Sequence, residues 1–407
     1  MASTISLLVM IWVLLGWAVQ AYLARRQARF LATARVPAMF ADSVAPDKHA
    51  RACAYGRARL LTRLADSGWT VLLAVVWTLG GGLAALAALM PAGWVGQVLL
   101  LAAFAGIHEC LRVPPRLIQV FVVDTRFGFN RMTPLLFARD ALIKAALAAA
   151  LLAGGGLALL LPVMLMGPPG WGLSALAAVL AGGFLLWAQP RLIAPLFNRF
   201  EALEQGPLRE RLEAMIERCG ARAESMFVMD GSRRSALANA YFAGFGRAKR
   251  VVLFDTLIRE LDDDEIEAVL AHELGHDREG HIRRHYARLG GLLMVGIVGL
   301  GAAGEWGWLG ALGVPAMAGA WLAAGYLLLP LMAWPLQPWL AACLRRYEFE
   351  ADAFAVRHAD AGALVSALHK LLTRNAAALA ADPLYAAFHA SHPPPDQRLA
   401  ALQQGSS

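Results

Sequence analysis

Four long stretches of the chain contain no lysine or arginine. They cover residues 1–24, 69–111, 145–190 and 289–344, and they are rich in apolar residues. A helix that crosses the hydrocarbon core of a bilayer needs about 20 mainly apolar residues. The first stretch therefore has room for one span and each of the other three for two. This pattern predicts about seven transmembrane helices.

Turn-forming residues divide each of the three longer stretches. They are Met90-Pro91-Ala92-Gly93, Gly167-Pro168-Pro169-Gly170 and Leu312-Gly313-Val314-Pro315. Composition points the same way, because 58% of the residues are hydrophobic and only 16% are charged, whereas charged residues make up about 25% of a typical soluble domain. We therefore expect a mainly α multi-pass protein that is embedded in the lipid bilayer.

The basic residues indicate an orientation. All 37 lysines and arginines lie in residues 25–68, 112–144, 191–288 and 345–407, which are alternate loops of a seven-span chain. The positive-inside rule places these loops in the cytoplasm and the N-terminus outside. The net charge of +7 is then a signature of topology. No clustered basic arm is present, so we do not expect a nucleic-acid partner.

The first apolar segment could instead be a cleaved secretory signal. A signal peptide carries its positive charge before the apolar run. Here no basic residue precedes the run, and Arg25 and Arg26 follow it directly. We therefore interpret the segment as a retained anchor with its N-terminus outside.

Two regions, residues 196–288 and 345–407, are polar enough to fold outside the bilayer. Only two spans separate them, so we expect them to form one cytoplasmic domain in two parts. The remaining divisions are a membrane region of about five spans over residues 1–195 and the two further spans over 289–344.

The first polar region predicts a helix followed by a small sheet. The helix begins at Pro207 and ends near Gly220, which is a stop signal. Short β-type runs follow at residues 226–229, 240–245 and 250–254, with turns at 231–234 and 246–249. These short runs and turns favour a small antiparallel sheet.

A longer helix is predicted after this sheet. Asp262 and Glu265 have the spacing of a capping box, and further acids follow in the first turn. The periodic sequence from Glu265 to Leu289 shows no strong stop signal, so we expect the helix to run unbroken into the sixth span.

This helix carries the motif His272-Glu273-Leu274-Gly275-His276. Histidines at i and i+4 share one helix face, so both rings can bind a single zinc ion. Glu273 is rotated away from that face and can act as general base, taking a proton from a zinc-activated water. A second pair, His281 and His285, lies off the first face, and we interpret it as a polar continuation of the helix.

A hydrolytic zinc site keeps three protein ligands and one open position. Glu348 and Asp352 follow the seventh span at i and i+4, again on one helix face. We assign Glu348 as the third ligand and Asp352 as the acceptor that orients a ligand histidine. Glu350 points about 200° away from Glu348 around the helix. A solvated acidic helix face is the alternative interpretation of this pair.

Several motifs in one order resemble the CAAX prenyl protease 1 family of seven-span membrane zinc endopeptidases. They are FVVDTRFGFN (121–130), IAPLFNRFEAL (193–203), SALANAYFAGFGRAKRVVLFDTLI (235–258), HELGH, RRYEFEADAFA and SHPPPDQRL. The resemblance covers nearly the whole chain. It implies a zincin-like metalloprotease domain, one zinc ion per chain bound by His272, His276 and Glu348, and Glu273 as the base.

The resemblance also implies roles that the residues alone do not reveal. Asn239 and Ala240 would lie on an edge strand that pairs with the extended backbone of a substrate. His392 and Arg398 would stabilise the oxyanion that develops on the scissile carbonyl. The implied substrates are membrane-associated or prenylated CAAX-type peptides or proteins.

Two other functions stay open at this point. A quality-control protease of the HtpX type would share the zinc chemistry but would cut damaged membrane proteins. A catalytically silent scaffold is disfavoured, because base, ligands and supporting acid are all present. A site-two protease would carry an Asp-Gly ligand motif within a later span, which the sequence lacks.

Overall fold

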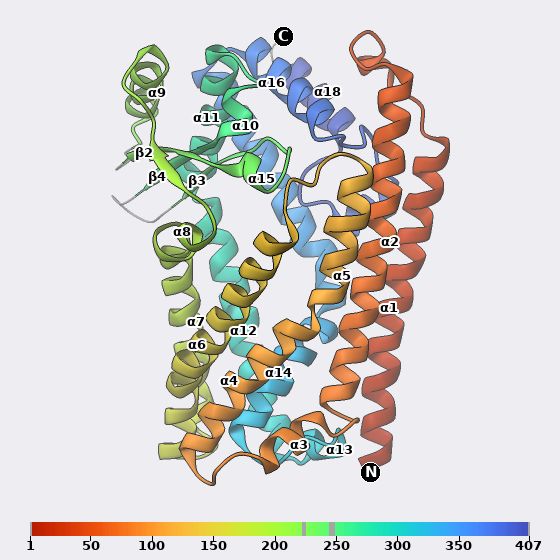
Figure 1. Cartoon of the computed structure of the whole chain (residues 1–407), viewed down its shortest axis with the longest axis vertical. Helices are drawn as coiled ribbons and strands as arrows, with labels where there is room; N and C mark the ends of the chain where they lie inside the picture. Colours follow the sequence, from red (N-terminus) through yellow and green to blue (C-terminus); the bar gives the residue numbers. More distant parts are fainter. Residues whose placement is uncertain (1, 222–224, 244–248, 406–407) are drawn as a thin grey trace.

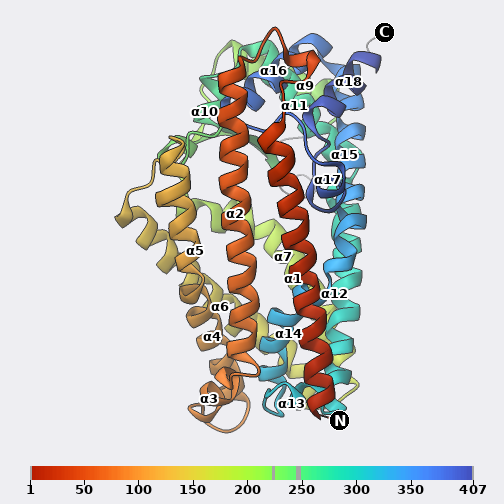
Figure 2. The same cartoon turned by 90° about the vertical axis from the view of Figure 1, so that its right-hand side faces the viewer.

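The computed structural model of the chain describes residues 2–221, 225–243 and 249–405. Long helices run side by side for most of its height, and a small sheet with shorter helices lies at one end (Figure 1). The N-terminus lies at the opposite end from the sheet and from the C-terminus (Figure 2). The molecule therefore has a region of long helices and, at one end, a smaller region that contains the sheet.

Among the described residues, six helical segments are long and apolar enough to cross a membrane, and one bent pair of helices would make a seventh. This agrees with the predicted number of about seven. The helices that start these segments are α1 (Ala2–Thr33), α2 (Pro46–Trp77), α4 (Trp94–Leu111), α6 (Pro134–Met166), α7 (Gly170–Ala188), α12 (His281–Glu305) and α14 (Ala318–Met332).

Shorter elements extend or connect these helices. A short helix α5 (Val113–Leu117) and a π-helix η2 (Ile118–Asp124) prolong α4, and a π-helix η3 (Gln189–Ile193) and α8 (Ala194–Phe197) prolong α7. The remaining connectors are η1 (Ala38–Phe40), α3 (Gly82–Ala88) and α13 (Trp308–Ala311).

Small residues let the membrane helices approach one another closely, as expected where helix association depends on packing. Helix α12 packs against both α7 and α14. A Cβ atom at Gly304 of α12 would lie 2.3 Å from the ring of Trp321 on α14. A side chain at this position would therefore force the two helices apart.

The polar domain combines the two separate regions of sequence. Helices from both regions surround one apolar core. They are α9 (Pro207–Arg218), α10 (Asp255–Ile258), α11 (Asp263–Arg278), α15 (Gln337–His358), α16 (Ala361–Arg374) and α18 (Pro395–Gly405). The short η5 (Trp334–Leu336) precedes α15, and α17 (Pro383–His389) lies in the chain between α16 and α18.

The sheet of this domain is mixed and not purely antiparallel. Its order is β1-β2-β4-β3, formed by β1 (Phe200–Ala202), β2 (Ser225–Met229), β4 (Arg250–Phe254) and β3 (Ala240–Ala243). Strands β3 and β4 pair antiparallel, whereas β2 and β4 are parallel.

The prediction of an antiparallel sheet was wrong for the pair β2 and β4. The strand between them in sequence, β3, pairs with the edge of β4 that faces away from β2, so β2 and β4 lie side by side and run in the same direction. The turn at 231–234 is a short 3₁₀ helix, η4 (Gly231–Arg233), within the longer link from β2 to β3. The end of the 240–245 run and most of the predicted turn at 246–249 lie outside the described residues.

The helix that carries the HELGH motif does not run unbroken into the membrane. Helix α11 ends at Arg278 and α12 begins at His281, with Gly280 between them in the left-handed conformation at φ +66°. Glycine adopts this conformation without the steric cost that a Cβ atom adds. The expectation of a continuous helix was therefore wrong, and Gly280 is the residue that permits the break.

Replacement of Gly280 should lower stability according to how well each residue tolerates a positive φ. We expect Gly280→Val to reduce the free energy of unfolding by about 1–2 kcal/mol, because a Cβ atom crowds the following carbonyl in this conformation. Gly280→Asn should cost less, because asparagine visits the left-handed region more readily. Thermal unfolding of both purified variants in detergent tests this order, and equal stability of the two would contradict it.

Candidate metal centre

Helix α11 begins as the sequence predicts. The Glu265 N–H donates to Asp262 Oδ1 at 3.0 Å, and the Asp262 N–H donates to Glu265 Oε2 at 3.0 Å, which confirms the capping box. Ile266, Leu270 and Leu274 are buried and anchor the helix in the core of the domain. The motif thus lies on a helix that is fixed at its start and along one face.

A glycine within the motif allows α11 to contact α15. A Cβ atom at Gly275 would lie 3.0 Å from the Cα atom of Ala351, so the two backbones are close at this point. Glu348 and Asp352 flank Ala351 on α15, and both are buried. The close contact therefore brings acidic side chains of α15 to the histidine face of α11.

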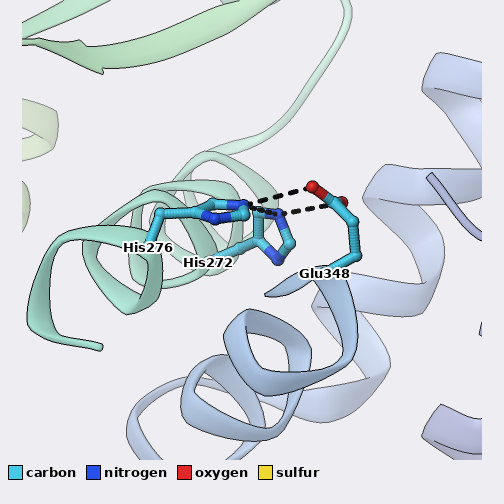
Figure 3. A group of neighbouring side chains, drawn as sticks. All are labelled: His272, His276 and Glu348. Atoms are coloured by element: carbon cyan, nitrogen blue, oxygen red, sulfur yellow. Dashed lines mark hydrogen bonds and ion pairs between the residues drawn. The ribbon is translucent and has the colours of Figure 1, made fainter. Parts of the chain in front are cut away.

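Figure 3 shows His272 and His276 of α11 facing the carboxylate of Glu348. The distances are 3.2 Å between the two Nε2 atoms, 3.6 Å from His272 Nε2 to Glu348 Oε2 and 3.3 Å from His276 Nε2 to Glu348 Oε1. Ligand atoms about 2.0–2.2 Å from a tetrahedral zinc are themselves roughly 3.3–3.6 Å apart. The three side chains therefore fit one metal ion.

Glu348 carries a second indication that a cation belongs here. Its Oε2 atom is buried and accepts no hydrogen bond, although Arg398 Nη1 lies 3.5 Å from it. A buried carboxylate oxygen without a partner is costly unless a cation or another donor satisfies it. The donor set of two imidazoles and one carboxylate is also the type that zinc accepts.

Asp352 contacts the other ring nitrogen of His272. His272 Nδ1 lies 2.9 Å from Asp352 Oδ1, and Arg398 donates to both oxygens of the same carboxylate at 2.6 Å. Burial alone would lower the pKa of Arg398, but its bonds to Asp352 raise the pKa above its usual value. Arg398 therefore stays charged and holds Asp352 against the histidine.

His276 also has a partner, and this one was missed in the sequence. His281 Nδ1 lies 2.9 Å from His276 Nδ1, and His281 Nε2 lies 3.0 Å from Glu350 Oε2. On an unbroken helix His281 would point away from His276, but the turn at Gly280 brings it back. The glycine five residues after Gly275 was the signal that could have located this contact.

Most of the predicted site residues line one small cavity of about 150 Å³. Glu273 lies in its wall with His272 and Glu348. His276 is not part of the lining but contacts His272 and Glu348, and Asp352 contacts His272. His392 reaches it from the loop before α18, with Nε2 at 3.4 Å from Glu348 Oε1. The other predicted residues in the lining are Asn239, Ala240 and Arg398.

Asn239 and Ala240 reach the cavity from the edge of the sheet, because β3 is the last strand in the order. The Asn239 carbonyl accepts from the Phe254 N–H at 3.1 Å, which joins it to β4. Its side chain accepts from the Ala240 N–H at 2.9 Å. Each of the predicted site residues therefore lies in or directly beside one constellation.

Comparison with known protein families agrees with this architecture. The family profile described as peptidase family M48 matches residues 202–406, and the profile described as the CAAX prenyl protease N-terminal region, with five membrane helices, matches residues 27–199. The two matches together extend over nearly the whole chain.

Curated relatives align over almost their full length. A CAAX prenyl protease 1 homologue of Oryza sativa subsp. japonica is 32% identical, and the alignment covers 98% of this chain and 97% of the relative. CAAX prenyl protease 1 of Saccharomyces cerevisiae is 28% identical, with coverage of 94% and 92%.

A solved structure has the same fold. The crystal structure of Ste24p from S. mikatae superimposes with a TM-score of 0.84 at 25% sequence identity and covers 98% of each chain. The family profiles, the relatives and the shared fold identify a membrane zinc metalloprotease. The chain belongs to the CAAX prenyl protease 1 family within peptidase family M48.

Proposed function

We propose that this enzyme binds one zinc ion and hydrolyses peptide bonds in membrane-associated substrates of the prenylated CAAX type. One cavity carries the proposal. Its lining contains Glu273, two of the side chains that fit a metal, His272 and Glu348, and the edge of the sheet at Asn239 and Ala240. The names of the relatives support the substrate class. The membrane helices below the domain would hold a lipidated substrate near this cavity.

His272, His276 and Glu348 would bind the zinc ion. When bound, zinc supplies Lewis acidity, which polarises a carbonyl and lowers the pKa of water toward about 7. Asp352 fixes the ring of His272, and His281 contacts the ring of His276, so both rings are held in orientation from outside the ligand set.

The other side chains have distinct roles in this proposal. Glu273 takes a proton from the attacking water and passes it to the leaving amine. His392 lies at the mouth of the site with its side chain 66% exposed, where it can donate to the oxyanion. Arg398 donates hydrogen bonds from Nε and Nη2 to the carboxylate of Asp352. Its third nitrogen, Nη1, lies 3.5 Å from Glu348 Oε2.

We further propose that the N-terminus is outside and the metal centre is on the cytoplasmic side. The support is the confinement of lysine and arginine to alternate loops. The N-terminus and the polar domain lie at opposite ends of the molecule (Figure 1).

Replacement of the base should greatly reduce turnover and leave the metal in place. We expect Glu273→Gln to bind one zinc per chain and to lose about 10²- to 10⁴-fold in kcat, because only the proton acceptor is removed. The measurement is cleavage of a farnesylated CAAX-type peptide by enzyme reconstituted in lipid nanodiscs. Near-normal turnover in the variant would contradict the role of Glu273.

The same assay separates the proposed substrate class from quality-control proteolysis. A prenylated peptide should be cleaved with a kcat/KM at least about tenfold above its unprenylated form. Equal rates on both forms, together with rapid cleavage of an unfolded membrane protein, would support the HtpX-type function instead.

Two acids on α15 should differ in their effect on the metal. Glu348→Ala should lose most of the bound zinc and all activity, because it removes a ligand atom. Glu350 instead bonds to His281, Arg284 and Arg346. Glu350→Ala should therefore keep zinc near one per chain and lose at most about 100-fold in activity, as is typical for groups outside the ligand set.

Zinc content by atomic emission decides between the two acids, with circular dichroism as the check on folding. Full metal content in Glu348→Ala with loss in Glu350→Ala would overturn the ligand assignment.

The proposed orientation is testable with single cysteines in a background that lacks the four native ones. The positions are Ala92, between α3 and α4, Glu305, the last residue of α12, and Glu217 of α9, and all three side chains are exposed. Figure 1 shows α3 and α13, which follow α2 and α12, at the end that contains the N-terminus, and α9 at the other end. An impermeant maleimide should label the first two in intact cells and label Glu217→Cys only after lysis. The reverse pattern would place the metal centre outside.

A further inference from the structure

One face of α15 carries a cation beside the acids of the metal centre. Arg345, Glu348 and Asp352 have the spacing i, i+3 and i+7, which places them along one side of the helix. Glu348 faces the two histidines of α11, and Asp352 accepts hydrogen bonds from Arg398. Arg345 lies about one turn before Glu348, so its side chain acts close to the metal centre.

The side chain of Arg345 binds the C-terminal end of α17. Its Nη1 atom donates to the carbonyls of Ala386 and Ala390 at 2.9 Å each and to the carbonyl of Ala387 at 3.4 Å. The last carbonyls of a helix lack partners within the helix, and a cation at this end interacts favourably with the helix dipole. Arg345 therefore supplies the donor and the charge that the end of α17 needs.

The start of α17 is held separately. The Asp382 carboxylate caps the helix and accepts from the N–H groups of Leu384 and Tyr385 at 3.1 and 3.0 Å. Arg26 of α1 donates to both oxygens of this carboxylate at 3.2 and 2.9 Å, and the Asp382 N–H donates to Gln27 Oε1 at 2.7 Å. Figure 2 shows α17 beside α15 and α1. Helix α1 thus holds the start of α17, and α15 holds its end.

His392 follows directly after the end that Arg345 binds. Only one residue lies between Ala390, whose carbonyl accepts from Arg345, and His392. The next two residues, Pro393 and Pro394, are buried, and their rings restrict the backbone. The side chain of His392 is 66% exposed. The backbone on either side therefore largely determines where the ring of His392 lies.

The chain after the two prolines is also anchored on α15. Helix α18 follows them and carries Arg398, which donates to both oxygens of Asp352 at 2.6 Å. The segment that contains His392 is therefore bound to α15 before it, by Arg345, and after it, by Asp352. Glu348, whose Oε1 atom lies 3.4 Å from His392 Nε2, stands between these two anchors on the helix.

We propose that Arg345 is a positioning residue, which fixes the end of α17 so that the ring of His392 is held beside Glu348 in the orientation that catalysis requires. The proposal rests on the role of His392 in the proposed function. Arg345 contacts backbone carbonyls and is not among the described residues that line the cavity of the metal centre. Its loss should therefore slow the chemical step and leave substrate and metal binding nearly unchanged.

A double-mutant cycle tests whether Arg345 acts through His392. Cleavage of the farnesylated peptide in lipid nanodiscs is measured for Arg345→Ala, His392→Ala and the double variant. We expect kcat to fall about 10²- to 10³-fold in His392→Ala, as for loss of an oxyanion donor, and roughly 10- to 100-fold in Arg345→Ala. The double variant should be at most about threefold slower than His392→Ala, because residues that act as a unit are not additive.

Further measurements separate positioning from a general loss of structure. Arg345→Ala should keep about one zinc per chain and a KM within about threefold of wild type, because the ligand set and the cavity lining are unchanged. Arg345→Lys should recover part of the lost kcat, since an ammonium group can still donate to the carbonyls. Arg357→Ala is the matched control, because this exposed arginine of α15 lies over the ring of Phe354. The control should keep the wild-type kcat.

Hydrogen exchange reports on the segment without depending on hydrolysis. In Arg345→Ala, mass spectrometry should show the amides of residues 388–392 exchanging at least about tenfold faster than in wild type, because the end of α17 is released. The amides of α11 should keep their wild-type protection. Asp382 and Arg26 still hold the start of α17, so the effect should be smallest there.

Three results would each overturn the proposal. They are additive losses of kcat in the double variant, loss of zinc from Arg345→Ala, and unchanged exchange of residues 388–392. Failure of the proposed function looks different. If neither wild type nor any variant cleaves the peptide but exchange is faster in Arg345→Ala, the proposed function fails and the hold of Arg345 on this segment stands. If His392→Ala is slow but Arg345→Ala is as fast as wild type, the function stands and the positioning role fails.

Discussion

The contact between Gly275 and Ala351 is the constraint on which the metal centre depends. Two histidines on one helix offer only part of the donor set that a hydrolytic zinc needs. The third donor that fits the same ion, Glu348, comes from a helix far away in the sequence. Because the backbones of α11 and α15 lie so close, Glu348 reaches both rings and Asp352 reaches the far side of one. A side chain at Gly275 would separate the acids from the histidines.

Around this contact the charges are arranged in pairs. Arg398 neutralises Asp352, and Asp352 in turn contacts His272. On the other side, Glu350 contacts His281, which contacts His276. His272 is therefore held by Asp352, which Arg398 supports, and His276 by His281, which Glu350 supports. Because the site is buried, a charged group without a partner would be costly, so these partners are needed.

The sequence predicted those features that depend on local periodicity. Apolar length and the absence of lysine and arginine located the membrane helices, and i, i+4 spacing singled out both the histidine pair and the pair of Glu348 and Asp352. It failed where distant segments decide the outcome. The parallel pairing of β2 with β4 depends on which side of β4 takes β3, and the contact of Asn375 with Ala238 joins segments with no shared local pattern. His281 was missed because a single left-handed glycine reverses the direction that helical spacing implies.

That glycine also links the metal centre mechanically to the bilayer. Helix α12 continues from His281 into the membrane and packs against α7 and α14, whereas α11 belongs to the core of the polar domain. Gly280 therefore connects α12, which continues into the membrane, to α11, which packs in the core of the polar domain. A change in the tilt of α12, which bilayer thickness influences, would move His281 relative to His276. The thickness of the surrounding membrane could thus influence the orientation of an imidazole that fits the metal.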